Sequence, residues 1–153
     1  MFVLKYGVDF DVMVQNSRLI FFMRCGKMDL LDVCLTRFHE KDTLSWNSMI
    51  FGYCNNGRID IARELIQVGM PDRNVEFPWT SIMCGYVRVG DMDRARAYLT
   101  QCLQNTASWN VMLSGYETLG ILIAAIYIFE TMPYRDIGSM EFIISGCCKT
   151  GNP

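Results

Sequence analysis

The amino-acid sequence predicts an all-α fold, an α-solenoid of stacked antiparallel helix hairpins with about nine helices. The first observation is a nine-residue segment whose second residue is tryptophan and whose last two residues are Gly-Tyr. It recurs at residues 45–53, 78–86 and 108–116, with weaker copies at 14–20 and 139–147. The second is a glycine that recurs with the same spacing, at Gly26, Gly57, Gly90, Gly120 and Gly151. The third is the absence of strand patterns of period two. A repeat length near 30 residues is typical of helical arrays.

The first helix of each unit is expected to begin near the start of the segment. In the second unit Ser45 is a plausible N-cap, and Trp46, Met49, Ile50 and Tyr53 follow at spacings of three or four residues. This spacing places the apolar side chains on one helix face. A hairpin cannot bury such a face alone, so neighbouring hairpins are expected to stack on it.

The second helix of each unit is expected to follow the periodic glycine, which fits the left-handed residue that ends a helix. In the second unit it is predicted from about residue 59 to 68, with Ile59, Ala62, Leu65 and Ile66 on one face. A small Ala five residues after the glycine recurs as Ala62, Ala95 and Ala125. The pairs Met70-Pro71 and Met132-Pro133 stop the helix, because proline cannot continue it.

This pattern divides the chain into four complete repeats and two partial ones. The complete repeats are residues 12–42, 43–74, 75–105 and 106–136; residues 1–11 end a preceding repeat, and 137–153 supply the first helix of a fifth. The chain is therefore expected to be a fragment or a truncated product. The longest uncharged apolar stretch, residues 119–129, is about half of the ~20 residues that a membrane span needs, which predicts a buried helix instead.

Composition excludes several classes of protein. The 153 residues carry 14 Lys plus Arg and 16 Asp plus Glu, and half are apolar, which excludes disordered and polybasic proteins and argues weakly against nucleic-acid binding. Seven cysteines without a CxxC pair, and the single His39, offer no zinc-binding spacing. Reduced thiols in an intracellular compartment are expected, without disulfides, a metal, a cofactor or an enzymatic activity. The first residues resemble neither a secretory signal nor a transit peptide.

The repeat motif resembles that of the pentatricopeptide repeat family. The segments "DTLSWNSMIFGYCNNGRIDIARELI", "WTSIMCGYVRVGDMDRARAYL" and "MPYRD" carry the resemblance. The first repeat, with "VMVQNSRLIFFMRCGKMDL", is similar to the longer repeats of the plant mixed-length (PLS-type) subclass. Departures are Gly69 and one residue within 75–78, which look like insertions, Tyr98 in place of an aliphatic residue, and the loss of Met-Pro at the end of the third repeat.

The resemblance implies binding of single-stranded RNA, one base per repeat, with each base read by two or three side chains. The helix reading positions are Asn16, Asn47, Thr80 and Asn110. The closing positions, each the last residue of a repeat, are Asp42, Asn74, Asn105 and Asp136. The base-wedging positions are Met13, Leu44 and Ala107, with Glu76 or Phe77 in the third repeat. The family's code then gives 5′-U-Y-A-U-3′, and Glu141 has no closing partner.

By the same resemblance, the partner is organellar RNA in a plant mitochondrion or chloroplast, together with other RNA-processing proteins and no membrane. The RNA-processing step would be editing, splicing or stability. Four repeats should bind weakly, micromolar at best, because stacking contributes roughly 1–3 kcal/mol per base. Two alternatives stay open. The chain could be a protein-binding helical scaffold, or it could be a truncated paralogue without a function.

Each candidate also has a purely structural interpretation. An Asn or Thr in the first turn of a helix, and an Asp or Asn before it, are often capping groups. Trp46, Trp79 and Trp109 could be stacking platforms for bases, but their apolar neighbours favour a place in the core between repeats.

Overall fold

The computed structural model describes residues 12–37, 41–71, 76–101 and 105–151. All regular elements within these ranges are helices, so the predicted all-α class of stacked helix hairpins is confirmed. The chain divides into two compact units, residues 1–78 and 79–153.

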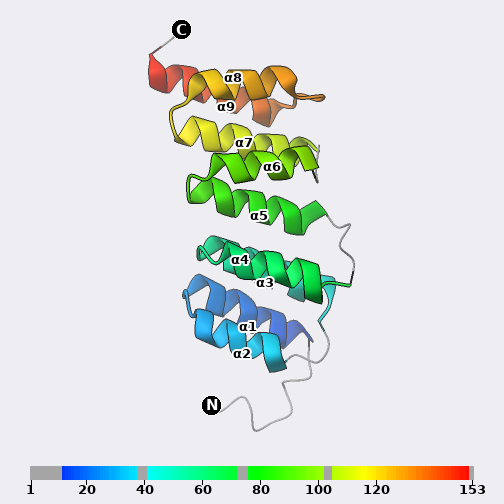
Figure 1. The fold of residues 1–153 in the computed structure, drawn as a ribbon. Coiled ribbons are helices and arrows are strands. Elements are labelled where there is room, and N and C mark those ends of the chain that lie inside the picture. The colour runs from blue at the N-terminus through cyan, green and yellow to red at the C-terminus, as the bar shows by residue number, and fades with distance from the viewer. Residues whose placement is uncertain (1–11, 38–40, 72–75, 102–104, 152–153) are drawn as a thin grey trace. The chain divides into compact units, whose positions relative to one another are not determined.

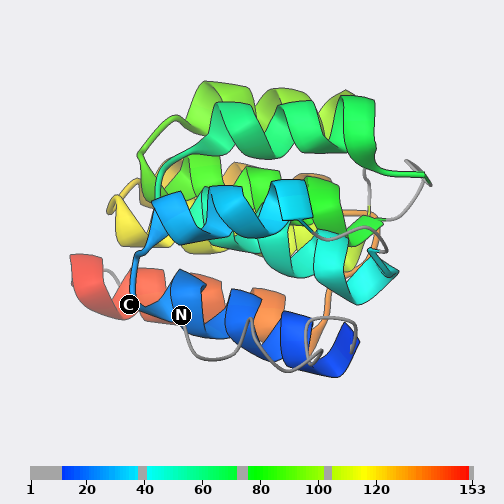
Figure 2. The ribbon, with the colours of Figure 1, turned by 90° about the horizontal axis from the view of Figure 1, so that it is seen from below.

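The N-terminal unit contains two hairpins. The first is α1 (Val12–Arg24) with α2 (Met28–Arg37), and the second is α3 (Thr43–Asn55) with α4 (Ile59–Glu64) and its continuation η3 (Leu65–Gly69). Helix α1 packs against both α2 and α3, and α3 packs against α4 (Figure 1). The view from below shows α1 and α2 lying side by side, joined by a short connection (Figure 2).

The C-terminal unit contains most of α5 (Glu76–Arg88), which starts three residues before the boundary. It continues with α6 (Met92–Gln101), α7 (Thr106–Thr118), α8 (Leu122–Thr131) and α9 (Ile137–Thr150). Helix α7 packs against α6, α8 and α9, and α8 also packs against α9 (Figure 1). The same order of first and second helices thus recurs in both units.

The ends of the helices follow from short sequence signals. The five periodic glycines all have positive φ, between 64° and 80°, which confirms them as the left-handed residues after the first helices. The prediction that Ser45 is the N-cap of the first helix in the second unit is wrong. The N-cap of α3 is Asp42, whose side chain accepts a hydrogen bond from the Ser45 amide, while Ser45 is the third helical residue and completely buried.

Small residues let the helices approach closely. Ala62, Ala95 and Ala125 are all buried, as their spacing predicts. Gly52 in α3 permits an even closer contact, because a Cβ there would clash with the side chain of Met23 in α1. Even alanine at Gly52 would therefore force the Met23 side chain to move.

One extra residue in the second repeat is accommodated inside a helix. The second helices α2, α6 and α8 have ten residues each, whereas α4 and η3 together span residues 59–69. Leu65–Gly69 form a π-helical turn, closed by a 3.0 Å hydrogen bond from the Met70 amide to the Leu65 carbonyl. A single-turn π-bulge is the usual way for a helix to hold one inserted residue. The sequence-based suspicion of an insertion at Gly69 therefore has a structural counterpart.

The prediction of a buried helix over residues 119–129 is wrong in part. In α8 the side chains of Ala125 and Ile128 are buried, but Ile123 is 85% exposed, and Ile126 and Tyr127 are also exposed. The apolar run continues around the helix, so only one of its faces can meet α7 and α9. No helix in the described part of the chain is both long enough and apolar enough to span a membrane.

Candidate functional site

The predicted reading and wedging residues occupy the same two positions on each first helix. Asn16, Asn47, Thr80 and Asn110 are the fifth residues of α1, α3, α5 and α7. The second residues of these helices are Met13, Leu44, Phe77 and Ala107, so the helix register selects Phe77 rather than Glu76. Met13, Leu44 and Phe77 are 79%, 57% and 49% exposed. Apolar side chains therefore project from the first turn where the sequence comparison expects wedges.

The closing residues are N-caps, as the structural interpretation of the sequence anticipated. Asp42, Asn105 and Asp136 lie directly before α3, α7 and α9, and each side chain accepts a hydrogen bond of 2.7 or 2.8 Å from the amide of the third helical residue. Asn74 lies outside the described residues. It stands two residues before the first residue of α5, whereas the other three closing residues stand one residue before their helices.

The fourth reading pair is in direct contact. Asn110 Nδ2 donates to the Asp136 carboxylate, 3.1 Å from Oδ2 and 3.3 Å from Oδ1. The Asp136 carboxylate is exposed, and its pKa is lowered chiefly by the hydrogen bond from the Ser139 amide. The Asn110 carbonyl oxygen is buried and has no hydrogen-bond partner among the described residues. The pair thus presents a fixed anionic acceptor beside an amide donor at the surface.

The first reading pair is linked through a third side chain. Ser45 Oγ lies 2.7 Å from Asn16 Oδ1 and 2.6 Å from Asp42 Oδ1, and the Ser45 amide donates to the same Asp42 oxygen at 2.7 Å. Asn16 is only 6% exposed. The hydrogen bond from the Ser45 hydroxyl is the largest cause that lowers the pKa of Asp42. The first pair is therefore more deeply set than the fourth.

A groove of about 460 Å³ runs along α1 and α3 in the N-terminal unit. Asn47 and Leu44 line it together with the apolar side chains of Ile20 and Phe51 and the charged side chain of Arg24. The carbonyl oxygen of Asn47 is buried without a partner among the described residues. A polar reading residue beside an apolar wedge, in a groove of ligand-site dimensions, suits a flat heterocycle with a polar edge.

The second residue of α9, Gly138, lies over the fourth pair. A Cβ at Gly138 would lie 3.5 Å from Asp136 Oδ1 and 3.6 Å from Asn110 Nδ2, which are ordinary contact distances. Any side chain at this position would therefore cover the pair. At this junction the second residue of the following helix thus adjoins the reading pair.

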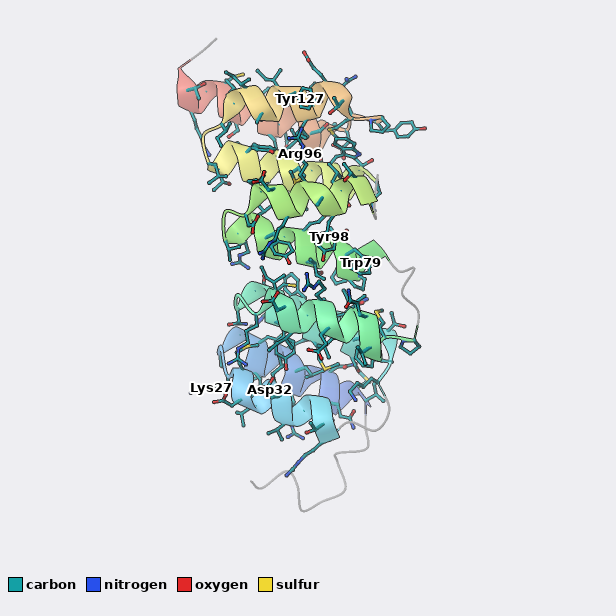
Figure 3. All side chains as sticks on the ribbon, in the orientation of Figure 1. Lys27, Asp32, Trp79, Arg96, Tyr98 and Tyr127 are labelled. Carbon is teal, nitrogen blue, oxygen red and sulfur yellow. The ribbon has the colours of Figure 1, made fainter. Side chains whose placement is uncertain are left out.

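Two of the tryptophans, Trp46 and Trp79, contact the second helix of their own hairpin. The Trp46 ring lies against Gly69, where a Cβ would come within 2.7 Å of it, and Trp79 stacks on Tyr98 with ring centroids 5.9 Å apart (Figure 3). Tyr98 also stacks on Tyr86, at 5.8 Å. These contacts join the first and second helices of one repeat; the expected packing between repeats stays a prediction. The unusual Tyr98 completes a short aromatic stack.

The sequence did not identify two positions that lie against the predicted reading pairs, namely Ser45 and Gly138. A signal for the first was present, because a serine stands three residues after each described closing residue, as Ser45, Ser108 and Ser139. Within the described ranges no group of three or more His, Cys, Asp or Glu side chains could hold a metal ion, and none of the described cysteines forms a disulfide.

Comparison with known proteins identifies the repeats. Residues 39–67, 77–105 and 107–137 match sequence profiles described as "PPR repeat". A chloroplastic pentatricopeptide repeat-containing protein of Arabidopsis thaliana is 29% identical over 98% of this chain. Two mitochondrial proteins of the same description and organism are 27% and 25% identical over 99% and 95% of it. The chain spans only 29%, 17% and 26% of the length of these three relatives.

Proposed function

Because this chain belongs to the pentatricopeptide repeat family, we propose that it binds single-stranded RNA, one base per repeat, as a sequence-specific adaptor. The observation that carries the proposal is the contact between Asn110 and Asp136, which joins the two predicted reading residues of one repeat at the protein surface. The proposed partner is an organellar transcript in a chloroplast or mitochondrion, and the proposed role is editing, splicing or stability without catalysis. Membership of the plant mixed-length subclass is part of the same proposal.

The chemistry of the fourth pair suits the edge of a base. The Asp136 carboxylate only accepts hydrogen bonds, and the second N–H of the Asn110 amide remains to donate one. The Watson–Crick edge of uracil offers the N3–H donor between two carbonyl acceptors, so Asp136 can accept from N3–H while Asn110 donates to a carbonyl. Other bases also present adjacent donors and acceptors, so the preference for U rests on the family's code.

The exposed wedges supply a second, less selective interaction. Met13, Leu44 and Phe77 place apolar surface beside the reading positions, and stacking on such groups contributes roughly 1–3 kcal/mol per base. With four repeats and an association cost of roughly 4 kcal/mol or more, we expect micromolar affinity at best for 5′-U-Y-A-U-3′. Selectivity then comes from the reading pairs and affinity chiefly from the wedges.

The test is to transplant the third pair onto the fourth. Thr80 with Asn105 is proposed to read A, so the double variant Asn110→Thr/Asp136→Asn should shift the preferred fourth base from U to A. Fluorescence anisotropy at low salt would compare 5′-U-C-A-U-3′ with 5′-U-C-A-A-3′ for both proteins. Exposed Ile144, changed to Leu, serves as a control on the neighbouring helix. Equal binding of the two RNAs by both proteins would contradict base reading by this pair.

A second function is supported by the exposed face of α8. Ile123, Ile126 and Tyr127 leave an apolar surface that a protein partner could cover. If the chain acts as a protein-binding scaffold, the change Ile123→Glu should abolish a purified interaction that RNase leaves intact. If the chain acts through RNA, the same change should leave binding to 5′-U-C-A-U-3′ unaltered.

A further inference from the structure

We propose that Ser45 is a positioning residue for base reading by the first repeat, because its hydroxyl connects the reading residue Asn16 to the closing residue Asp42. The proposal rests on the proposed RNA-binding function and adds a third residue to one of its reading pairs. Ser45 would not touch the RNA. It would fix how the two residues that do so are presented.

The three side chains form one compact cluster at the junction of the first two repeats. Ser45 Oγ is within 2.7 Å of both Asn16 and Asp42, and it is completely buried. Asn16 comes from α1, Asp42 precedes α3, and Ser45 lies in the first turn of α3. A hydroxyl at this point therefore ties the two repeats together where a base would be read.

The single proton of the hydroxyl serves both side chains of the pair. The Ser45 hydroxyl lies within hydrogen-bond distance of two acceptors, Asn16 Oδ1 and Asp42 Oδ1, and its one proton is shared between them. With Asn16 Oδ1 on Ser45, Nδ2 of the same amide faces Asp42, and a hydrogen bond from the Asn16 side chain lowers the pKa of that carboxyl group.

This direction matches that in the fourth pair. Asn110 also turns its Nδ2 toward its closing aspartate. In both repeats the closing carboxylate thus orients the reading amide with the same polarity. In the first pair Ser45 also holds the other end of the amide, Asn16 Oδ1, whereas Asn110 Oδ1 has no hydrogen-bond partner among the described residues.

The chain supplies matched serines for comparison. Ser45, Ser108 and Ser139 are the third residues of α3, α7 and α9, and all three are completely buried. The Ser108 hydroxyl has no hydrogen-bond partner among the described residues. The Ser139 hydroxyl donates to the Asp136 carbonyl and accepts from the Asp136 amide, so it closes a capping box. Only Ser45 joins the two side chains of a reading pair.

The experiment compares Ser45→Ala with Ser108→Ala in the full chain. Binding would be measured by fluorescence anisotropy to 5′-U-C-A-U-3′ and to 5′-A-C-A-U-3′, which differ at the first base. Removing the Ser45 hydroxyl should lower discrimination at that base by roughly three- to tenfold, the range that one net hydrogen bond supports. Discrimination at the fourth base should not change, and Ser108→Ala should leave both unaltered.

A second measurement does not depend on RNA. The pKa of Asp42, followed by NMR, should rise toward its ordinary value of 3.8 in Ser45→Ala, and the Asn16 side-chain amide signals should shift. An unchanged Asp42 pKa would overturn the proposed connection even if Ser45→Ala proved too unstable for binding studies. An Asp42 pKa that rises without any loss of selectivity at the first base would reduce Ser45 to a capping role.

The two proposals fail in different ways. If the unaltered chain binds both RNAs equally, base reading itself fails, while the NMR result can still show the hydrogen-bonded cluster. If the unaltered chain prefers U first and Ser45→Ala keeps that preference undiminished, only the role of Ser45 is overturned.

Discussion

The first and fourth reading pairs consist of the same two residue types, yet they are built differently. Asn16 and Asp42 are bridged by Ser45, and Asn16 is almost fully buried. Asn110 and Asp136 bond directly, and Asn110 is half-buried. A two-letter code assigns both pairs the same base. The comparison teaches that residue identity at two positions does not fix how a donor and an acceptor are presented, because a neighbour in the following helix takes part.

The largest difference between the pairs should appear in stability. Asp42→Ala removes the N-cap of α3 and also leaves the buried Ser45 hydroxyl and Asn16 amide without their acceptor, at a cost of about 2 kcal/mol. Asp136→Ala should cost less, because the contact with Asn110 is exposed and breaks into solvent. Urea unfolding of both variants checks the order. Equal losses would show that the Ser45 bridge contributes nothing.

Base binding at the fourth pair should become stronger if the following helix gains an apolar side chain at its second position, where α3, after the first pair, already has Leu44. Gly138→Leu would place apolar surface over Asn110 and Asp136, as Leu44 does on its helix, and the Cβ fits at 3.5 Å. Affinity for 5′-U-C-A-U-3′ should rise about two- to fivefold, at the lower end of a stacking contribution. Isothermal titration of the variant beside Ile144→Leu measures it. No gain would mean that the second position of α9 does not adjoin a bound base.

Acid should act on both pairs in the same direction, because the pKa values of Asp42 and Asp136 are both lowered. The pKa of Asp42 is lowered in the folded chain, so its stabilising effect is complete above the ordinary value of 3.8 and is lost as pH falls through the lowered value. Asp42→Asn should therefore flatten the dependence of unfolding free energy on pH below about 4. Thermal unfolding at pH 2–5 provides the measurement. A slope unaffected by Asp42→Asn would exclude this carboxyl as a titrating group.

The smallest difference concerns salt. Arg24 lines the groove beside Asn47, whereas the residue at the same place in α7, Thr118, is neutral. Arg24→Ala should reduce the slope of log affinity against log salt by about 0.7, the value of one phosphate contact on a single strand. Thr118→Ala is the matched control and should leave the slope unchanged. Binding assays between about 50 and 200 mM salt would detect either result.

Much of the fold could be predicted from the sequence, because it depends on periodic local signals. Each signal predicts one part of the hairpin. The tryptophan segments mark the first helices, the glycines of positive φ mark the ends of those helices, and the buried alanines mark where the helices approach closely. The N-cap was misassigned because Asp42 and Ser45 are both good capping residues, and only backbone geometry distinguishes them. The burial of α8 was misjudged because an apolar run does not reveal how many neighbours a helix has.

The candidate site was less predictable, because its important contacts cross between repeats. Helix register alone placed Asn47, Thr80 and Asn110 at one position. The bridge from Ser45 to Asn16, however, joins residues 29 apart in sequence, and the proximity of Gly138 to Asn110 joins residues of two helices. No local pattern specifies such contacts. Whether these residues bind RNA stays a prediction.

The π-helical turn at Leu65–Gly69 has a consequence for anyone who decodes such arrays. Because the helix itself takes up the added residue, counting a fixed number of positions forward from the start of a repeat drifts by one at its far end. Counting one residue back from the first residue of the next helix lands on Asp42, Asn105 and Asp136, but before α5 it lands on residue 75, one past Asn74. The second repeat thus departs from the others both at its π-helical turn and at its closing position, so its reading frame follows neither a fixed repeat length nor the start of the next helix.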